Sequence, residues 1–135
     1  MLTPENWRLQ VIVGIGIDLL ENRRVEEELK RGEWLASEGV FLPSELEQAN
    51  SCSRPALHLA ECFTGKEAAL KALGVGIGNI GCFREIEVFL GKTIEPWLMF
   101  HGKVKHQADQ MGIRRIRLSI TRTAKLTGAL VILES

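Results

Sequence analysis

The segment from Cys62 to Gly78, CFTGKEAALKALGVGIG, constrains the fold most, because it reads as a helix with a charge inside its apolar face. Lys66 projects into the middle of that face, where an unpaired charge is expensive. We therefore expect either an external anion or a carboxylate from another element beside it. At about 100° per residue, the apolar residues of this helix fall on one narrow stripe: Leu59, Cys62, Phe63, Leu70 and Leu73.

The same helix is expected to end in a loop with alternating glycines, Gly74, Gly76 and Gly78. Glycines allow backbone N–H groups to turn toward an anion such as a phosphate. Glu67 lies on the shoulder of the stripe and Lys71 follows one turn later. Two lysines and a glutamate beside such a loop suggest phosphate chemistry with a metal. The structural alternative is a lysine whose ammonium reaches water, followed by a glycine helix stop.

Length and composition limit the classes of function. With 135 residues and 45% hydrophobic content, the chain is expected to form a single globular domain spanning residues 1–135. Its 17 basic and 17 acidic residues cancel, which gives no sign of binding to nucleic acid or to an anionic membrane. Three unpaired cysteines favour a reducing, cytoplasmic compartment, and their spacing to the histidines predicts no zinc site. No apolar run is long enough to span a membrane, and no export signal is evident.

The first predicted strand, LQVIVGIGID, is apolar almost throughout, so both of its faces are expected to be covered. Asp18 stands at its C-terminal end, which is unfavourable unless the carboxylate binds a cation or caps a turn. Gly14 and Gly16 suggest a dinucleotide-binding loop, but they lie within the strand and the third glycine is missing. We therefore reject that interpretation.

The remaining pattern predicts three helices, two strands, one helix and two strands, and this order favours an α+β fold. Small, largely antiparallel strands should pack against the long central helix. Pro43, Ser44 and Glu47 suggest a capping box that starts the second helix. The first helix should end at Gly32 and carries a basic face, which either docks an acidic partner or is simply solvated. The basic residues of that face are Arg23, Arg24, Lys30 and Arg31.

Several motifs occur together in one order along the chain. They are Asp18 with Glu21, F-x-x-K-E-A from Phe63, K-A-L-G-x-G-I-G from Lys71, and S-I-T-x-T from Ser119. Together they resemble the 4′-phosphopantetheinyl transferases, most closely the short holo-acyl-carrier-protein synthase type. The resemblance runs from Gly14 to Glu134, and Phe63 to Gly78 is its most specific part. It implies the small α+β fold of that family and transfer of phosphopantetheine from coenzyme A to a serine of an apo acyl carrier protein, with release of 3′,5′-ADP.

The resemblance also implies roles for individual residues. Asp18 and Glu67 would be ligands of Mg²⁺, and Glu67 would also be the candidate base for the serine proton. Lys71 would lie along the coenzyme, and Lys66 would face the phosphates or brace the metal ligands. The further residues implied for the coenzyme are Gly74, Gly76, Gly78, Arg122 and Thr123, and the one implied for the carrier is Arg24.

The chain departs from the family pattern at several positions. Cys62 stands where the family often has arginine, and Arg122 stands where it often has histidine; both positions lie near the nucleotide's 3′-phosphate in that family. Arg122 can bond a phosphate bidentately and so compensate for the charge missing at Cys62. Thr93 replaces a usual proline and Leu126 a frequent aromatic residue. These changes leave open a dedicated carrier, such as a polyketide-type carrier domain.

The resemblance also implies a homotrimer in which the coenzyme binds between subunits. Arg122 and Thr123 would then serve the site of a neighbouring subunit. Two other hypotheses remain open at this point. One is a non-catalytic relative that binds coenzyme A or a carrier protein, and the other is a different metal-dependent phosphotransferase. The two costly carboxylates, Asp18 and Glu67, argue against a pure binding module.

Overall fold

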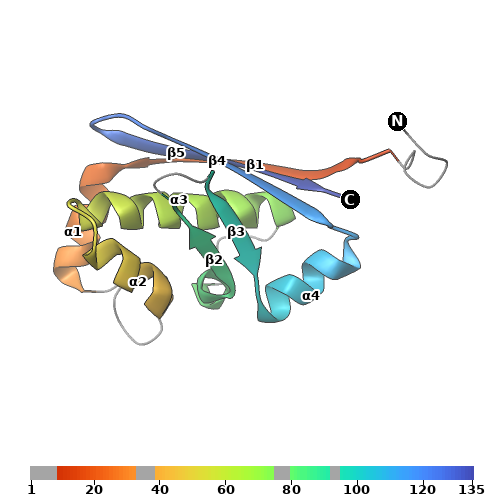
Figure 1. The fold of residues 1–135 in the computed structure, drawn as a ribbon, viewed down its shortest axis with the longest axis horizontal. Coiled ribbons are helices and arrows are strands. Elements are labelled where there is room, and N and C mark those ends of the chain that lie inside the picture. The colour runs from red at the N-terminus through yellow and green to blue at the C-terminus, as the bar shows by residue number, and fades with distance from the viewer. Residues whose placement is uncertain (1–8, 33–38, 75–79, 92–94) are drawn as a thin grey trace.

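The computed structural model describes residues 9–32, 39–74, 80–91 and 95–135 (Figure 1). Its strands form two antiparallel sheets, one with three strands in the order β1-β5-β4 and one that pairs β2 with β3. The predicted α+β class and the predicted order of elements are confirmed. The elements are β1 (Ile12–Glu21), α1 (Asn22–Arg31), α2 (Pro43–Asn50), α3 (Pro55–Leu73), the 3-10 helix η2 (Ile80–Glu85), β2 (Ile86–Phe89), β3 (Trp97–Phe100), α4 (Gly102–Gln110), β4 (Arg115–Arg122) and β5 (Leu126–Glu134).

The long helix α3 lies along the three-stranded sheet, with α1, α2 and the β2-β3 hairpin on its other sides (Figure 1). It is therefore buried on almost all of its sides. The sequence predicted a single narrow apolar stripe, but the buried surface of the helix is wider than that stripe. Small residues on its sheet side permit this packing. Its only charged side chain that is buried is Lys66, whereas Glu61, Glu67 and Lys71 reach its surface.

Two glycines bring β1 unusually close to α3. A Cβ on Gly16 would lie 1.9 Å from the carbonyl oxygen of Ala68, and a Cβ on Gly14 would lie 2.1 Å from that of Ala72. Such distances are far inside van der Waals contact, so only glycine permits this approach of strand to helix. Asp18 follows on the same face of β1 and is thereby held against α3.

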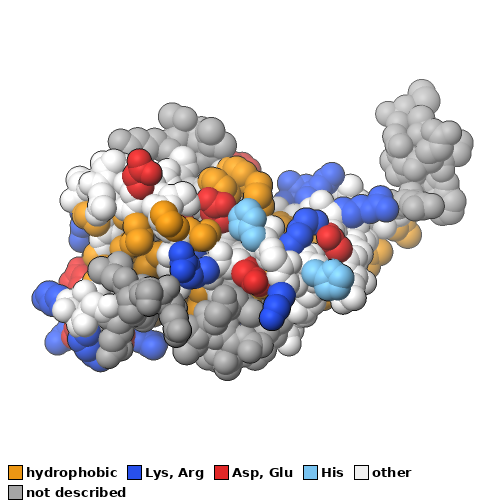
Figure 2. Space-filling model, turned by 90° about the horizontal axis from the view of Figure 1, so that it is seen from below, with side chains coloured by type: hydrophobic (Ala, Val, Ile, Leu, Met, Phe, Trp, Pro, Cys, Tyr) orange, Lys and Arg blue, Asp and Glu red, His pale blue; other side chains and the backbone are white. Residues whose placement is uncertain are grey.

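The opposite face of β1 is not covered by any element in the part of the chain that the structure describes. Ile15, Ile17 and Leu19 are 61%, 70% and 66% exposed. Among the described residues, the expectation that both faces of this strand are covered is therefore wrong, because α3 covers only one side of the sheet. The side of the molecule away from the sheet has a mixed surface. Figure 2 shows hydrophobic side chains there beside basic, acidic and histidine side chains.

Two local boundaries differ from the sequence expectation. β1 continues three residues beyond Asp18, to Glu21, because Leu19 and Leu20 keep pairing with β5. α2 does not begin with a Ser44–Glu47 box. Instead, the carboxylate of Glu45 accepts the backbone N–H of Leu42 at 2.8 Å. Gly32 ends α1 in a left-handed conformation, φ 75°, as predicted.

Candidate functional site

The first cluster of functional side chains lies where β1 faces α3. The Nζ atom of Lys71 lies 2.9 Å from Oδ1 of Asp18 and also donates to the carbonyl of Ile17 at 3.1 Å. Asp18 is largely buried, whereas the Lys71 side chain is 44% exposed. The cluster is thus reachable from solvent, as a substrate site requires.

Glu67 belongs to the same cluster, one helical turn before Lys71. Burial raises the pKa of its carboxyl above the ordinary value, and the negative charge of Asp18 raises this pKa further. The cations of Lys71 and Arg24 partly oppose this shift. The structure therefore pairs Asp18 with Lys71 and lets the charges of both act on Glu67. Arg24, for which the resemblance implied a separate role in carrier binding, also acts on Glu67.

The donor set fits a hard divalent cation. Asp18 and Glu67 supply carboxylate oxygens, and Lys71 neutralises only one of the two charges. A Mg²⁺ ion favours one or two carboxylates combined with waters and substrate phosphates, rather than a cage made entirely of protein ligands. The described ranges contain no group of three or more His, Cys, Asp or Glu side chains that could hold a metal by themselves.

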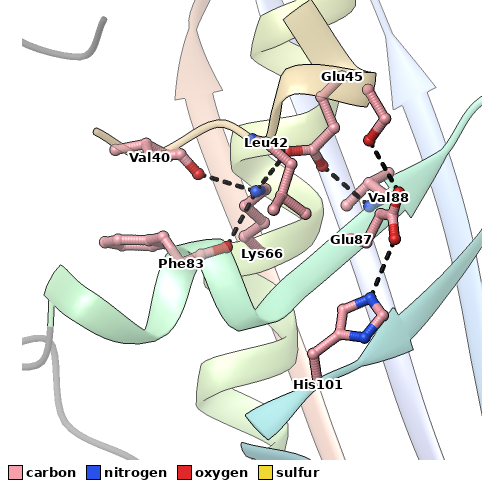
Figure 3. A network of polar contacts seen from close by, with 9 residues as sticks. Val40, Leu42, Glu45, Lys66, Phe83, Glu87, Val88 and His101 are labelled. Carbon is pink, nitrogen blue, oxygen red and sulfur yellow. Dashed lines mark hydrogen bonds and ion pairs between the residues drawn. The ribbon is translucent and has the colours of Figure 1, made fainter. Parts of the chain in front are cut away.

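The structure places Lys66 in the core rather than among the exposed charges. Its side chain is 0% exposed, and Nζ lies 2.6 Å from Oε1 of Glu45 (Figure 3). Nζ also donates to the carbonyls of Val40 at 2.8 Å and Phe83 at 2.9 Å. Burial lowers the pKa of the ammonium, and the Glu45 carboxylate opposes that shift. Because contact with a phosphate would require leaving three buried partners, we omit Lys66 from the catalytic set proposed below.

Glu45 joins α2, α3 and β2. Besides Lys66, its carboxylate accepts the N–H groups of Leu42 at 2.8 Å and Val88 at 2.9 Å. Figure 3 shows the neighbouring carboxylate of Glu87 extending this network toward His101, whose Nε2 lies 2.9 Å away. The sequence left two possible partners for the buried lysine, an external anion or a carboxylate from another element. The structure shows the second, since Glu45 lies on α2.

The glycine loop is only partly described. Gly74 is the C-cap of α3, with φ 75°, and its N–H bonds back to the carbonyls of Leu70 and Lys71. Gly76, Gly78 and Thr93 lie outside the described residues. Gly74 stands one turn beyond Lys71, so the loop begins beside the acidic cluster.

These observations can be set beside known proteins. A family model described as the 4′-phosphopantetheinyl transferase superfamily matches residues 14–121. This chain belongs to that superfamily. The holo-[acyl-carrier-protein] synthase of Pseudoalteromonas atlantica is 39% identical over 124 residues, 92% of this chain and 98% of that protein.

Solved structures of phosphopantetheinyl transferases share the fold. The holo-[acyl-carrier-protein] synthase of Neisseria meningitidis superposes with a TM-score of 0.80 at 28% identity, covering 93% of this chain and all of that one. The Bacillus anthracis synthase, solved in complex with coenzyme A (3′,5′-ADP), is 32% identical with a TM-score of 0.71, covering 94% and 99% of the two chains. The family and fold predicted from the motifs are confirmed. No described helix of this transferase is long and apolar enough to cross a bilayer.

The second group of predicted residues lies at the opposite edge of the transferase's sheet. Arg122 ends β4, and β5 separates that strand from β1, which carries Asp18. An Nη1 of Arg122 lies 2.7 Å from Oε1 of Glu61 on α3. Oγ1 of Thr123 accepts the N–H groups of Lys125 and Leu126, which leaves its own proton free to donate. One chain therefore does not bring Arg122 and Thr123 to the Asp18 cluster.

Sequence reasoning missed most of the residues around Arg122. They line a cavity of about 280 Å³. Burial raises the pKa of Glu61, and the Arg122 charge opposes that shift. Cys62, a residue of α3, is fully buried. Burial raises the pKa of its thiol, so Cys62 supplies no charge to this cavity. Only the basic character of Arg54 and Arg122 could have indicated this cavity, which is lined by Cys52, Ser53, Arg54, His58, Glu61, Leu90, Gly91 and Arg122.

Proposed function

We propose that this chain transfers the 4′-phosphopantetheine group of coenzyme A to a serine of an apo acyl carrier protein, with Mg²⁺, and releases 3′,5′-ADP. The observation that supports this most is the cluster at the β1–α3 contact. There, Asp18, Glu67 and Lys71 combine two carboxylates and one cation in a partly exposed position. The family and the coenzyme A complex of the Bacillus anthracis synthase support the same reaction.

The carrier serine attacks the β-phosphorus of coenzyme A, and 3′,5′-ADP leaves. We assign Glu67 as the group that accepts the serine proton, directly or through a water; burial and the Asp18 charge raise the pKa of its carboxyl, which supports this role. Lys71 binds phosphate oxygens and orients the diphosphate. Asp18 and Glu67 would hold Mg²⁺, which when bound offsets the negative charge that grows on the phosphoryl oxygens.

Further residues complete the binding of coenzyme A. Gly74 with Gly76 and Gly78 would offer backbone N–H groups beside Lys71. Arg122 and Thr123 would bind the nucleotide end, where the guanidinium can exchange Glu61 for a phosphate. Since they lie at the other edge of the sheet from Asp18, we assign them to a neighbouring subunit's site.

The assembly that this implies is a homotrimer. It is supported by the uncovered apolar face of β1, where Ile15, Ile17 and Leu19 are more than half exposed. Analytical ultracentrifugation of the chain, compared with Ile17→Asp, tests the assembly: we expect a trimer for the first and a monomer without transfer activity for the second.

Arg24 on α1 is the proposed contact with the acidic helix of the carrier. It is exposed, and its charge already influences Glu67, so a carrier docked on α1 lies near the reacting groups. The carrier itself is an acyl carrier protein or a polyketide-type carrier domain. The free thiols of Cys52 and Cys62 fit a cytoplasmic location.

One experiment tests the proposed reaction. The protein is incubated with coenzyme A, Mg²⁺ and a panel of apo carriers, and the intact mass of each carrier is measured. A gain of one phosphopantetheine on a carrier, with 3′,5′-ADP in the supernatant, is expected. Binding of coenzyme A without any mass gain would instead favour a non-catalytic relative. A different transferred group would favour another phosphotransferase.

A further inference from the structure

One buried asparagine makes a set of hydrogen bonds that the proposed reaction does not explain. Asn22 is the first residue of α1 and is 5% exposed. Its backbone N–H donates to the carbonyl of Lys125 at 2.8 Å. Its Nδ2 donates to the carbonyls of Thr123 and Ala124, each at 3.3 Å. Three successive carbonyls of the β4–β5 turn therefore accept hydrogen bonds from this one residue.

The other end of the amide is bonded as well. Oδ1 of Asn22 accepts the hydroxyl of Thr127 at 2.5 Å. Thr127 is fully buried in β5, where it pairs with Leu20 of β1 and Arg122 of β4. An apolar pair of similar size would fill this space without the cost of desolvating an amide and a hydroxyl. What hydrogen bonds add is direction, because they fix the angle between the groups they join.

In the proposed assembly, the two elements joined in this way serve two neighbouring sites. α1 carries Arg24, two residues after Asn22, while the turn follows directly on Arg122 and contains Thr123. The N-cap of α1, Glu21, makes no side-chain capping bond, so the helix start depends on Asn22 for its anchorage. The same two elements line a surface cavity of about 610 Å³.

We propose that Asn22 is a positioning residue that locks the carrier-docking helix α1 to the β4–β5 turn, so that Arg24 of one proposed site and the Arg122–Thr123 pair that serves the neighbouring site keep a fixed relative orientation. The inference rests on the proposed function for the roles of Arg24, Arg122 and Thr123. The bonding of Asn22 itself stands independently of that function.

The first test is Asn22→Leu, which keeps the volume and removes the amide. We expect KM for the carrier and KM for coenzyme A to rise together, each about fivefold to tenfold, because the variant removes all three side-chain hydrogen bonds of Asn22 and the loss of one is worth about twofold to threefold at the lower end. The turnover per active site should change less than about twofold, because Asn22 touches no reacting group. A fall in kcat with both KM values unchanged would overturn the proposal, since simple loss of folded enzyme gives that pattern.

Three further variants keep the test decisive if Asn22→Leu folds poorly. Thr127→Val removes one hydroxyl and should raise both KM values about twofold to threefold, whereas Thr127→Ser should restore them. Asn50→Leu makes the same chemical change at an exposed position and should leave both KM values unchanged. Equal kinetics for Thr127→Val and Thr127→Ser would contradict the proposal.

A readout without activity separates this inference from the proposed function. Hydrogen exchange of the backbone amides of Lys125 and Leu126, which bond to Thr123 Oγ1, should become at least about tenfold faster in Asn22→Leu and not in Asn50→Leu. If the wild-type protein modifies no carrier, the proposed function fails, yet this measurement still tests the lock. Unchanged exchange in Asn22→Leu would overturn it.

Discussion

Helix α3 contributes one lysine to each of two charged clusters, and the two clusters are built in opposite ways. Lys66 is fully buried, and Glu45 with two backbone carbonyls satisfies its ammonium completely. Lys71 is partly exposed, and it faces two carboxylates, Asp18 and Glu67, whose charges it cannot both neutralise. Complete bonding in the core indicates architecture, whereas an unbalanced, reachable charge indicates a place for a ligand.

The largest expected effect comes from the unbalanced cluster. Asp18→Ala and Glu67→Ala should each abolish transfer, a loss of more than about 1,000-fold, because each removes a proposed metal ligand. Intact-mass assays measure the transfer, and circular dichroism should show an unchanged fold. Glu47→Ala, an exposed acid on α2, serves as the control and should be fully active. Normal turnover in either cluster variant would refute the assignment.

The buried pair should show the reverse behaviour. Lys66→Met should reduce the free energy of unfolding by about 3–5 kcal/mol, since it leaves the Glu45 carboxylate buried without its cation. Urea titration measures the loss. The double variant Lys66→Met with Glu45→Leu should recover a large part of it. Transfer per folded molecule should stay within a few-fold of wild type. A stable Lys66→Met that cannot transfer would instead return this residue to the catalytic set.

A smaller effect is expected at the cation of the exposed cluster. Lys71→Met should reduce kcat/KM for coenzyme A about 100-fold, while Lys71→Arg should retain a larger share, because the charge is kept but its geometry changes. Steady-state kinetics with coenzyme A as the varied substrate decide the point. If Lys71→Met and wild type gave equal kcat/KM, the ammonium would have no part in binding the diphosphate.

The smallest effect concerns stability and pH. The folded-state pKa of Glu67 is raised by burial and by Asp18, so its ionisation costs stability as pH rises through that pKa. Without Mg²⁺, Glu67→Gln should therefore be slightly more stable than wild type above that pKa, which urea titration at several pH values measures. Added Mg²⁺ should raise Tm for wild type and not for Glu67→Gln. Equal Mg²⁺ shifts in both proteins would place the ion elsewhere.

Much of the fold followed from the sequence because its signals are local. Alternation in β4 and the glycine stop at Gly32 define their elements without reference to the rest of the chain. The cover of β1 could not be predicted in the same way. Its apolar pattern indicates two covered faces, but it cannot say whether the second cover comes from this chain or from another.

The candidate site was predictable only where both residues of a pair carried a signal. Asp18 was unusual on an apolar strand and Glu67 lay on a helix with two lysines, and the family resemblance then assigned both residues to one site. Glu45 looked like an ordinary residue of a helix start, and nothing local linked it to Lys66, 21 positions away. The Arg122–Glu61 pair likewise depends on how β4 crosses α3, which is a tertiary property.

The close contact of β1 with α3 has a further consequence for the chemistry. Main chain touches main chain at Gly16, so the gap between the two acids is fixed by residues that have no side chain at all. A single methyl group there would push the strand outward and part Asp18 from Glu67 while leaving every charged residue in place. A substitution of this glycine can therefore abolish activity although it alters no acidic or basic residue.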